Sequence, residues 1–401
     1  MSSLNRISSF HNYQSVQNDL RRQETLVHHN QEQLASGKKM LKPSDDPLAT
    51  HYVQNLKQEN RVLNQFIDGI VLARNRLEQQ ETMIDNAEQL TDEAKRTVME
   101  MINGTLAPED LEAKAREMDE FFDNFMTVAN TQDETGNYIF AGTKPKIQPF
   151  FRDPSGEVNY VGDDYQRKMK IAHSINMPFS DPGSKLFMEI PNPYGNYEPN
   201  YELQSASSLL LSEATQSDST DKSVYRITFV EMPNDEYGYQ LEQDGNVVDG
   251  GNFDPEQGVS FNGLTVHFQG QVTKGDVVEL SRRDNFSVFD SFRNAIESAH
   301  DSGAGSKMSV SAKLHQYTEE LHSAFVHLNK ARTDTGSRLS TLDIQEYQHE
   351  DFKYALRKSQ SNFEDLDYAQ AVIEFNENTR ALQASQQAFG KTKDLTLFNY
   401  L

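Results

Sequence analysis

The sequence contains no cysteine and no tryptophan. Without cysteine the chain has no disulfides, no thiol nucleophile and no thiolate ligand for a metal ion. It also lacks any apolar run approaching the ~18 residues that cross a membrane. Its opening residues, MSSLNRISSFHNYQSVQNDL, lack the apolar core of a signal peptide. We therefore expect no membrane insertion and no cleaved signal, and an exported chain of this kind needs another route.

Basic residues are scarce relative to acidic ones. The 401 residues include 38 Lys and Arg against 61 Asp and Glu, which gives a formal net charge of -23. Because a surplus of negative charge repels phosphate backbones, we expect no nucleic-acid partner. A chain of this length exceeds what one hydrophobic core usually organises, and it predicts two or three domains.

Apolar residues recur at intervals of seven near the N-terminus. The row consists of Tyr13, Leu20, Val27 and Leu34, and its companion positions Gln17, Glu24 and Gln31 are polar. This pattern predicts a helix with a half-apolar seam, which is weak by itself. Gly37 can end that helix, while Asp46 as N-cap and Pro47 at the first helical position can begin the next. We place the boundary near residue 42.

The most regular apolar pattern follows Pro47. Its two rows consist of Leu56, Leu63, Ile70, Leu77 and Ile84, and of Tyr52, Phe66, Ala73, Ala87 and Ala94. The pattern predicts a single helix over residues 47–102, roughly 80 Å long at ~1.5 Å per residue. After a turn, residues 108–130 carry apolar side chains at steps of three and four, which predicts a helix folding back on the first.

The middle of the chain has a different character. Between residues 136 and 280, Gly, Pro, Asn, Asp and aromatic residues are frequent, and runs such as SVYRITFV and LTVHFQGQVTKGDVVEL alternate apolar with polar residues. Such alternation around Gly-containing turns predicts β-hairpins. The insert forms either one unit or two subdomains joined near residues 205–222.

Helical periodicity returns after residue 285. FSVFDSFRNAIESAH predicts a short helix. A seven-residue ladder then runs through Leu314, Leu321, Leu328, Thr335 and Leu342, and a last segment carries Val372, Phe375, Leu382 and Phe389. Because both ends of the chain are helical and the middle is not, the simplest packing brings the two ends together in one bundle.

The predicted fold is mainly α with a β-rich insert. Residues 1–42 and 353–401 form terminal helices paired as an inner coiled coil, and residues 43–135 and 286–352 form a helical rod domain. Residues 136–285 form the β-rich outer insert.

The residues at both ends and at the start of the insert resemble the flagellin superfamily. The segments that carry the resemblance are NRISSFHNYQSVQNDL, QLASGKKMLKPSDDPLAT, GNYIFAGTKPKIQPF, GEVNYVGDD and DLDYAQAVIEFNENTRALQASQQAFGKTKDLTLFNYL. GNYIFAGT and DYAQA favour the hook-filament junction branch of the superfamily over filament flagellin.

The resemblance implies a structural subunit of the bacterial flagellum with no catalytic centre and no cofactor. It implies a ring of about eleven copies between a hook-side junction protein and the flagellin filament. It also implies export without a cleaved signal by the flagellar type III apparatus, with a cytoplasmic chaperone, and an extracellular location. Arg338 has the place of a superfamily residue at a rod contact, where it either pairs with acids of a neighbour or is a plain surface arginine.

Two other functions remain open. A filament flagellin would polymerise indefinitely, and an adhesive module carried by the β insert would bind glycans. An enzyme is the weakest option, because GKT at residues 390–392 lacks the earlier glycine and the strand of a phosphate loop. Asp45 and Asp46, flanked by prolines, are better explained as helix caps than as paired catalytic carboxylates. We identify no catalytic, cofactor-binding or metal-binding residue.

The chain ends in an unusually apolar segment, residues 395–401. Burying its five large apolar side chains contributes about 1.5–3 kcal/mol each, of order 10 kcal/mol in total. Ordering seven residues costs about 1–2 kcal/mol each, which is also of order 10 kcal/mol. Because the two nearly cancel, we expect residues 1–42 and 353–401 to order only when neighbouring subunits add contacts. The candidate assembly interface comprises Ile7, Phe10, Tyr13, Leu20, Val27, Leu34, Val372, Phe375, Leu382, Phe389, Leu395, Leu397, Phe398, Tyr400 and Leu401.

Overall fold

The structure is a computed structural model that describes residues 4–102, 107–232, 236–300 and 307–394. The chain divides into two compact units, Met1–Asp68 with Gln345–Leu401 and Gly69–Ile344. We call them the terminal unit and the central unit. The long helices near both ends and the β-rich middle confirm the predicted fold class.

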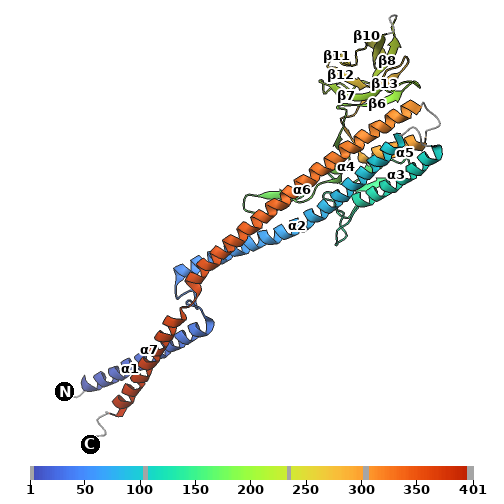
Figure 1. Cartoon of the computed structure of the whole chain (residues 1–401). Helices are drawn as coiled ribbons and strands as arrows, with labels where there is room; N and C mark the ends of the chain where they lie inside the picture. Colours follow the sequence, from blue (N-terminus) through green and yellow to red (C-terminus); the bar gives the residue numbers. More distant parts are fainter. Residues whose placement is uncertain (1–3, 103–106, 233–235, 301–306, 395–401) are drawn as a thin grey trace. The chain divides into compact units, whose positions relative to one another are not determined.

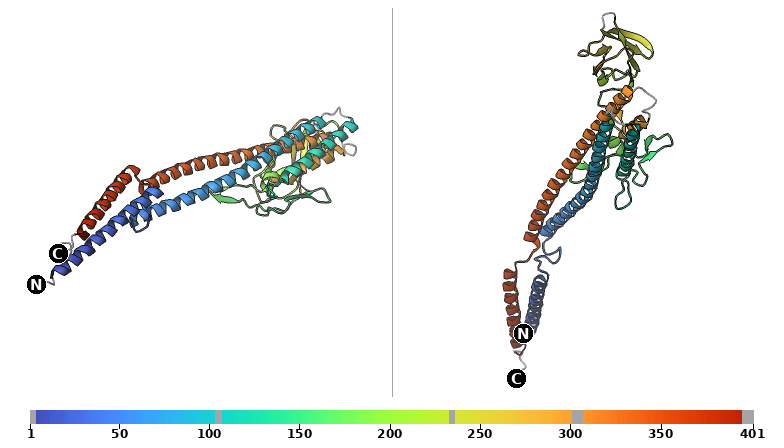
Figure 2. Two further views of the ribbon diagram at one scale, coloured as in Figure 1. Left: turned by 90° about the horizontal axis from the view of Figure 1, so that it is seen from below. Right: turned by 45° about the vertical axis from the view of Figure 1, so that its right-hand side comes forward.

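The terminal unit is helical. It contains α1 (Leu4–Ser36), the start of α2 (Pro47–Ile102), the end of α6 (Lys307–Glu364) and α7 (Tyr368–Asp394). α1 and α7 lie side by side and run antiparallel (Figures 1 and 2).

The predicted boundary chemistry between α1 and α2 is confirmed. Gly37 follows α1 with a φ of 69°, a left-handed conformation that glycine adopts without strain. The Asp46 carboxylate accepts the backbone N–H of Ala49 at 3.0 Å, and Pro47 is the first residue of α2. Asp45 instead closes the preceding turn. Its carboxylate accepts the N–H groups of Lys42 and Leu41, which lower its pKa.

The break between α6 and α7 lies at residues 365–367, so α6 runs on past residue 353, where we expect the terminal segment to begin. The sequence between 353 and 364 contains no glycine or proline that would end a helix. The break instead pairs with the turn after α1. The Lys39 N–H donates to the Glu364 carbonyl at 2.8 Å, and the Leu366 N–H donates to the Gly37 carbonyl at 3.0 Å.

The helices of the central unit enclose its main core. Beside the later part of α2 lie α3 (Pro108–Ala129) and α5 (Val288–His300), with the start of α6 alongside (Figure 1). The predicted ladder is confirmed, since its members are at most 2% exposed: Leu314, Leu321, Leu328, Thr335 and Leu342. The predicted rows of α2 are also buried, in both units, except that Tyr52 is 46% exposed.

The first part of the β insert packs on these helices. It contains the hairpin of β1 (Phe150–Arg152) and β2 (Val158–Tyr160), and that of β3 (Lys168–Lys170) and β4 (Asn176–Pro178). The short helix α4 (Gly183–Phe187) and the pair of β5 (Ile190–Pro191) with β14 (Asn285–Phe286) complete it. Ile171 and Met177 share a buried cluster with Ile70, Leu77 and Leu342.

The second part of the insert has two antiparallel sheets around a core of its own. One has the order β10 (Asn246–Asn252), β9 (Tyr237–Gln243), β8 (Tyr225–Glu231), β13 (Val277–Arg282) and β6 (Tyr197–Glu202). The other has the order β11 (Val259–Phe261), β12 (Leu264–Gln269) and β7 (Leu210–Gln216). Ala312 of α6 belongs to the same buried cluster, which joins these sheets to the helices.

The predicted join at residues 205–222 is wrong, because β7 lies within it. Leu209, Leu211 and Ala214 are buried in the core of the two sheets. The change between the two parts of the insert falls instead near residue 192, between β5 and β6. The apolar run LLL is the start of a strand rather than part of a linker.

Phe125 tests the core of the central unit. Its ring is fully buried and lies 5.4 Å from both Phe187 and Phe289, centroid to centroid. We expect Phe125→Ala to lower the free energy of unfolding by about 3–5 kcal/mol, because it leaves a cavity among these rings. Val326→Ala, at a 52% exposed position of α6, should change it by less than about 0.5 kcal/mol. Urea unfolding followed by circular dichroism measures both, and equal effects would contradict this core.

Candidate assembly surface

α1 and α7 face each other along one seam. On each helix the least exposed described side chains are spaced by three and four residues, as in a heptad repeat. The α1 side of the seam consists of Val16, Leu20, Gln23, Val27, Asn30 and Leu34, and the α7 side consists of Ala371, Phe375, Asn378, Leu382, Ser385 and Phe389. The Tyr13 and Phe389 rings lie 5.3 Å apart, centroid to centroid, near one end of the seam. Near the other end, the backbones of Lys38 and Asp365 form an isolated antiparallel β-bridge.

The structure brings seven of the predicted interface residues to this seam. Six of them are half-buried, namely Leu20, Val27, Leu34, Phe375, Leu382 and Phe389. The seventh, Tyr13, is 47% exposed, but its ring contacts that of Phe389. Val372 lies outside the seam with 45% exposure, because its neighbour Ala371 takes the buried position. The side chains of Ile7 and Phe10 lie outside the described set, as do residues 395–401 with Leu395, Leu397, Phe398, Tyr400 and Leu401.

The companion positions of α1 differ from the predicted ones by one residue. The helix turns Val16, Gln23 and Asn30 to the seam, whereas Gln17, Glu24 and Gln31 are exposed. The observed set follows the row of Tyr13, Leu20 and Val27 by three residues, and the predicted set follows it by four. Because both sets contain polar residues, the sequence alone does not distinguish the two spacings. The predicted half-apolar seam is nevertheless present, because Gln23 and Asn30 of the observed set are polar.

Two polar side chains weaken the seam. Asn30 is only 6% exposed. Within the described part of the chain, neither its Nδ2 nor the Oε1 of Gln23 has a hydrogen-bond partner, although both atoms are buried. A buried polar atom without a partner costs about 1–3 kcal/mol. The two unpartnered atoms, at Gln23 and Asn30, therefore lower the stability of the α1–α7 pair.

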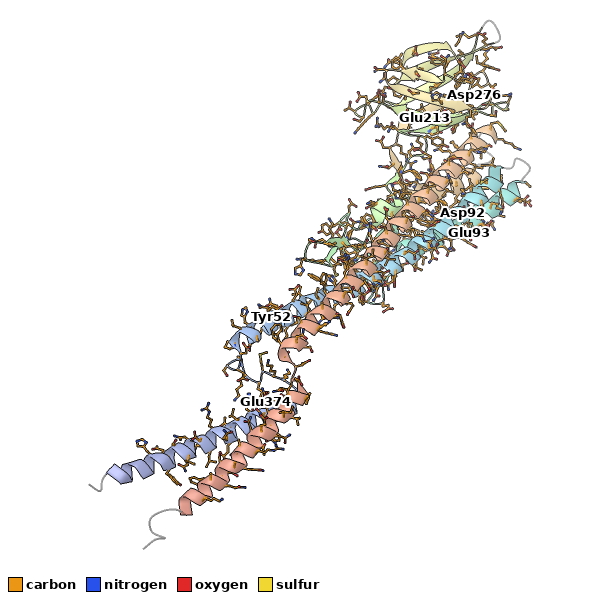
Figure 3. The ribbon with its side chains drawn as sticks, turned by 60° about the vertical axis from the view of Figure 1, so that its left-hand side comes forward. Tyr52, Asp92, Glu93, Glu213, Asp276 and Glu374 are labelled. Atoms are coloured by element: carbon orange, nitrogen blue, oxygen red, sulfur yellow. The ribbon has the colours of Figure 1, made fainter. Side chains whose placement is uncertain are left out.

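The seam also buries little apolar surface. Among the described side chains of α1 and α7, only Asn30 and Ala371 are classed as buried. Tyr368 and Val372 share one flank of α7, with 55% and 45% exposure, and Ile373 is 53% exposed on another face. The exposed carboxylate of Glu374 on the same helix accepts a hydrogen bond from Gln370 at 2.9 Å (Figure 3). Large apolar groups thus remain available on the outside of the pair.

An acidic side chain links the turn after α1 to the end of α6. The Glu364 carboxylate receives the Nζ atoms of Lys38 at 2.8 Å and Lys57 at 2.9 Å. Burial alone would raise the pKa of Glu364, but the hydrogen bonds from Lys38 and Lys57 outweigh it and lower that pKa to about 2. This ion-pair cluster holds α1, α2 and α6 together where the helix pair begins.

Arg338 has its partner within its own chain. Its Nη1 lies 2.7 Å from Asp181 Oδ2 and its Nη2 lies 3.2 Å from Oδ1, while Gln80 also donates to this carboxylate. The Arg338 side chain is 18% exposed. The alternative of a plain surface arginine is therefore wrong, because the Arg338 guanidinium is paired with a buried carboxylate of its own chain. Burial raises the pKa of Asp181, but the hydrogen bond and charge of Arg338 keep it below its ordinary value.

In the described ranges, no three His, Cys, Asp or Glu side chains are grouped so that they could hold a metal ion. None of the described helices has the length and apolarity needed to cross a membrane.

Known proteins resemble this chain in sequence and in fold. A family model described as the bacterial flagellin N-terminal helical region matches residues 7–145. Flagellar hook-associated protein 3 of Escherichia coli is 29% identical over 40% of this chain and 49% of its own length. The protein of the same name from Salmonella typhimurium is 27% identical over 41% of this chain and 53% of its own length. The chain thus spans about half the length of these curated relatives.

A crystal structure of flagellar hook-associated protein 3 from Legionella pneumophila superposes with a TM-score of 0.68. The match covers 77% of this chain and 98% of that chain. This chain has the fold of hook-associated protein 3. At 22% sequence identity, the structural likeness shows the fold alone. Together with the family-model match at residues 7–145 and the sequence matches to the curated relatives, it confirms the resemblance to the flagellin superfamily.

The Glu364 cluster predicts how the terminal unit responds to acid. Because the pKa of Glu364 lies below its ordinary value of 4.5, its ion pairs stabilise the fold above that pH. The stabilisation is lost as the pH falls toward about 2. We expect Glu364→Gln to lower the free energy of unfolding by about 1 kcal/mol at pH 7 and by less at pH 3. The effect at pH 7 is small because the two lysines are half exposed, so solvent screens their ion pairs.

Urea unfolding at both pH values measures this difference. The exposed Glu377 of α7 supplies the control variant Glu377→Gln, which should change stability little at either pH. Equal destabilisation by Glu364→Gln at pH 7 and pH 3 would show that its charge is not what matters.

Proposed function

We propose that this protein is a structural subunit of the bacterial flagellum. It forms the adaptor layer at the hook-filament junction on which the flagellin filament assembles. Two observations support the proposal: the curated relatives are named flagellar hook-associated protein 3, and the chain has the fold of that protein. The relatives' name also favours the junction role over a filament flagellin.

The observation that carries the mechanism is the weak seam between α1 and α7. A helix pair with two unpartnered polar atoms and half-exposed apolar side chains gains little from folding in one copy. Neighbouring copies that cover Tyr368, Val372 and Ile373 remove further apolar surface from water. Folding of the helix pair is then coupled to assembly.

The proposed partners are those that the resemblance to the flagellin superfamily implies. Copies of the chain pack through repeated heterologous contacts, each of which adds a rotation, so that the copies close into a ring. The resemblance to the flagellin superfamily implies about eleven subunits in it. The hook-side junction protein and flagellin lie on the two sides of the ring. A cytoplasmic export chaperone covers the C-terminal segment before export. No nucleic acid and no membrane insertion are involved.

The site of action is the flagellum outside the cell. The chain leaves the cell without a cleaved signal, by type III export in an extended state. Absence of cysteine is compatible with this route, because no disulfide has to be opened before the chain is threaded. The seam of α1 and α7 is noncovalent and opens at low cost. The protein acts by packing and carries out no catalysis.

Deleting residues 390–401 tests the proposed role. The deletion removes the apolar C-terminal segment but no residue of the central unit. We expect loss of incorporation and of filament growth, while the central unit unfolds at an unchanged urea concentration. Electron microscopy of cells and swimming assays measure the first effect.

Val247→Ser, at an exposed position of β10 (59%), is the matched control and should leave filaments normal. Cells that carry the deletion and still grow normal filaments would contradict the role given to this segment.

A further inference from the structure

A groove opens in the terminal unit where α1 passes into α2. It encloses about 770 Å³ between the end of α1, the connection, the first turns of α2 and the end of α6. We call it the connection groove. Its apolar lining consists of Met40, Leu48, Ala49, Tyr52 and Phe363. The Tyr52 and Phe363 rings lie 4.9 Å apart, and Figure 3 places Tyr52 on the first turns of α2.

The apolar lining of this groove faces solvent. Leu48 is 86% exposed, Tyr52 46% and Phe363 41%. Three large apolar side chains around one cavity are costly to leave in water, and such a patch on a subunit commonly binds another chain. The rim is polar, with Asp45 and Asp46 among its residues.

Residues 395–401 match this lining in chemistry. The segment LTLFNYL contains three leucines, one phenylalanine and one tyrosine. Lys391, Lys393 and Asp394 precede it. The polar lining of the groove likewise carries both signs, with Asp45 and Asp46 beside Lys39, so charged groups at the entrance can pair in either direction. Asp45 remains ionised because the backbone N–H groups of Lys42 and Leu41 lower its pKa.

The segment of the same chain cannot fill the groove. The groove lies beside the start of α7, and α7 carries residue 394 to the opposite end of the helix pair (Figures 1 and 2). The 27 residues of α7 span roughly 40 Å at ~1.5 Å per residue. Seven extended residues reach at most about 25 Å. The occupant must therefore come from another copy.

We propose that the connection groove of one copy binds residues 395–401 of a second copy. The contact joins two different surfaces, so it is heterologous and repeats from copy to copy. The inference rests on the proposed function in one respect, namely that copies of this chain pack beside one another. It adds a specific contact, with the donor segment and the acceptor groove both named.

Cysteine cross-linking tests the contact directly, because the natural chain has no cysteine. Full-length chains carrying Leu48→Cys are mixed with full-length chains carrying Phe398→Cys and oxidised. Non-reducing electrophoresis then shows any covalent dimer. We expect a dimer band about tenfold stronger than that of a control mixture, as the apolar area at Leu48 favours docking. The control mixture replaces Leu48→Cys by Val326→Cys, at an exposed position of α6.

A further chain with Lys38→Cys and Asp365→Cys shows that the oxidation works. These residues form an antiparallel bridge within one chain, at a spacing that a disulfide can span. Circular dichroism confirms that each variant is folded. The proposal is overturned if this control oxidises but the dimer band of the Leu48→Cys and Phe398→Cys mixture is no stronger than that of the mixture with Val326→Cys.

Immunogold labelling of flagella separates this inference from the proposed function. Label at the hook-filament boundary without the dimer band rejects the connection groove and leaves the junction role. The dimer band together with label spread along the filament rejects the junction role and leaves the groove contact.

Discussion

The weak seam between α1 and α7 is the constraint on which the assembly behaviour depends. In the central unit, α2 and α6 meet through side chains such as Ile84, Leu321 and Leu328, which are fully buried. In the terminal unit, the helix pair instead buries Asn30 and leaves its Nδ2 without a partner in the described residues. The same chain therefore combines a central unit that is stable by itself with a helix pair, α1 and α7, whose folding depends on contacts from neighbouring copies.

The Glu364 cluster lies where the weak helix pair joins α2 and α6. Its lysines hold the turn after α1 and the start of α2 against the end of α6, where the weak pair begins. The pair can then open along its length without disturbing α2 or α6. The connection groove lies in the same place, where the end of α1, the connection, the first turns of α2 and the end of α6 meet.

Much of the helical architecture was predictable from the sequence, because local chemistry determines it. Asp46, Pro47 and an unbroken heptad pattern set the bounds of α2. Predictions failed where distant residues decide. Arg338 pairs with Asp181, 157 positions away, and the groove combines Met40 with Phe363. The run at residues 209–211 resembled a linker until its partner strand β12 was known. No local pattern contains these pairings.

Amide hydrogen exchange on the isolated chain at low concentration tests the central claim most directly. The account predicts slow exchange in the later part of α2 and the early part of α6, and fast exchange throughout α1 and α7. Exchange in α1 and α7 should slow when the chain assembles. Strong protection of residues 382–394 in a dilute, unassembled chain would contradict the account, because the helix pair would then be stable without neighbours.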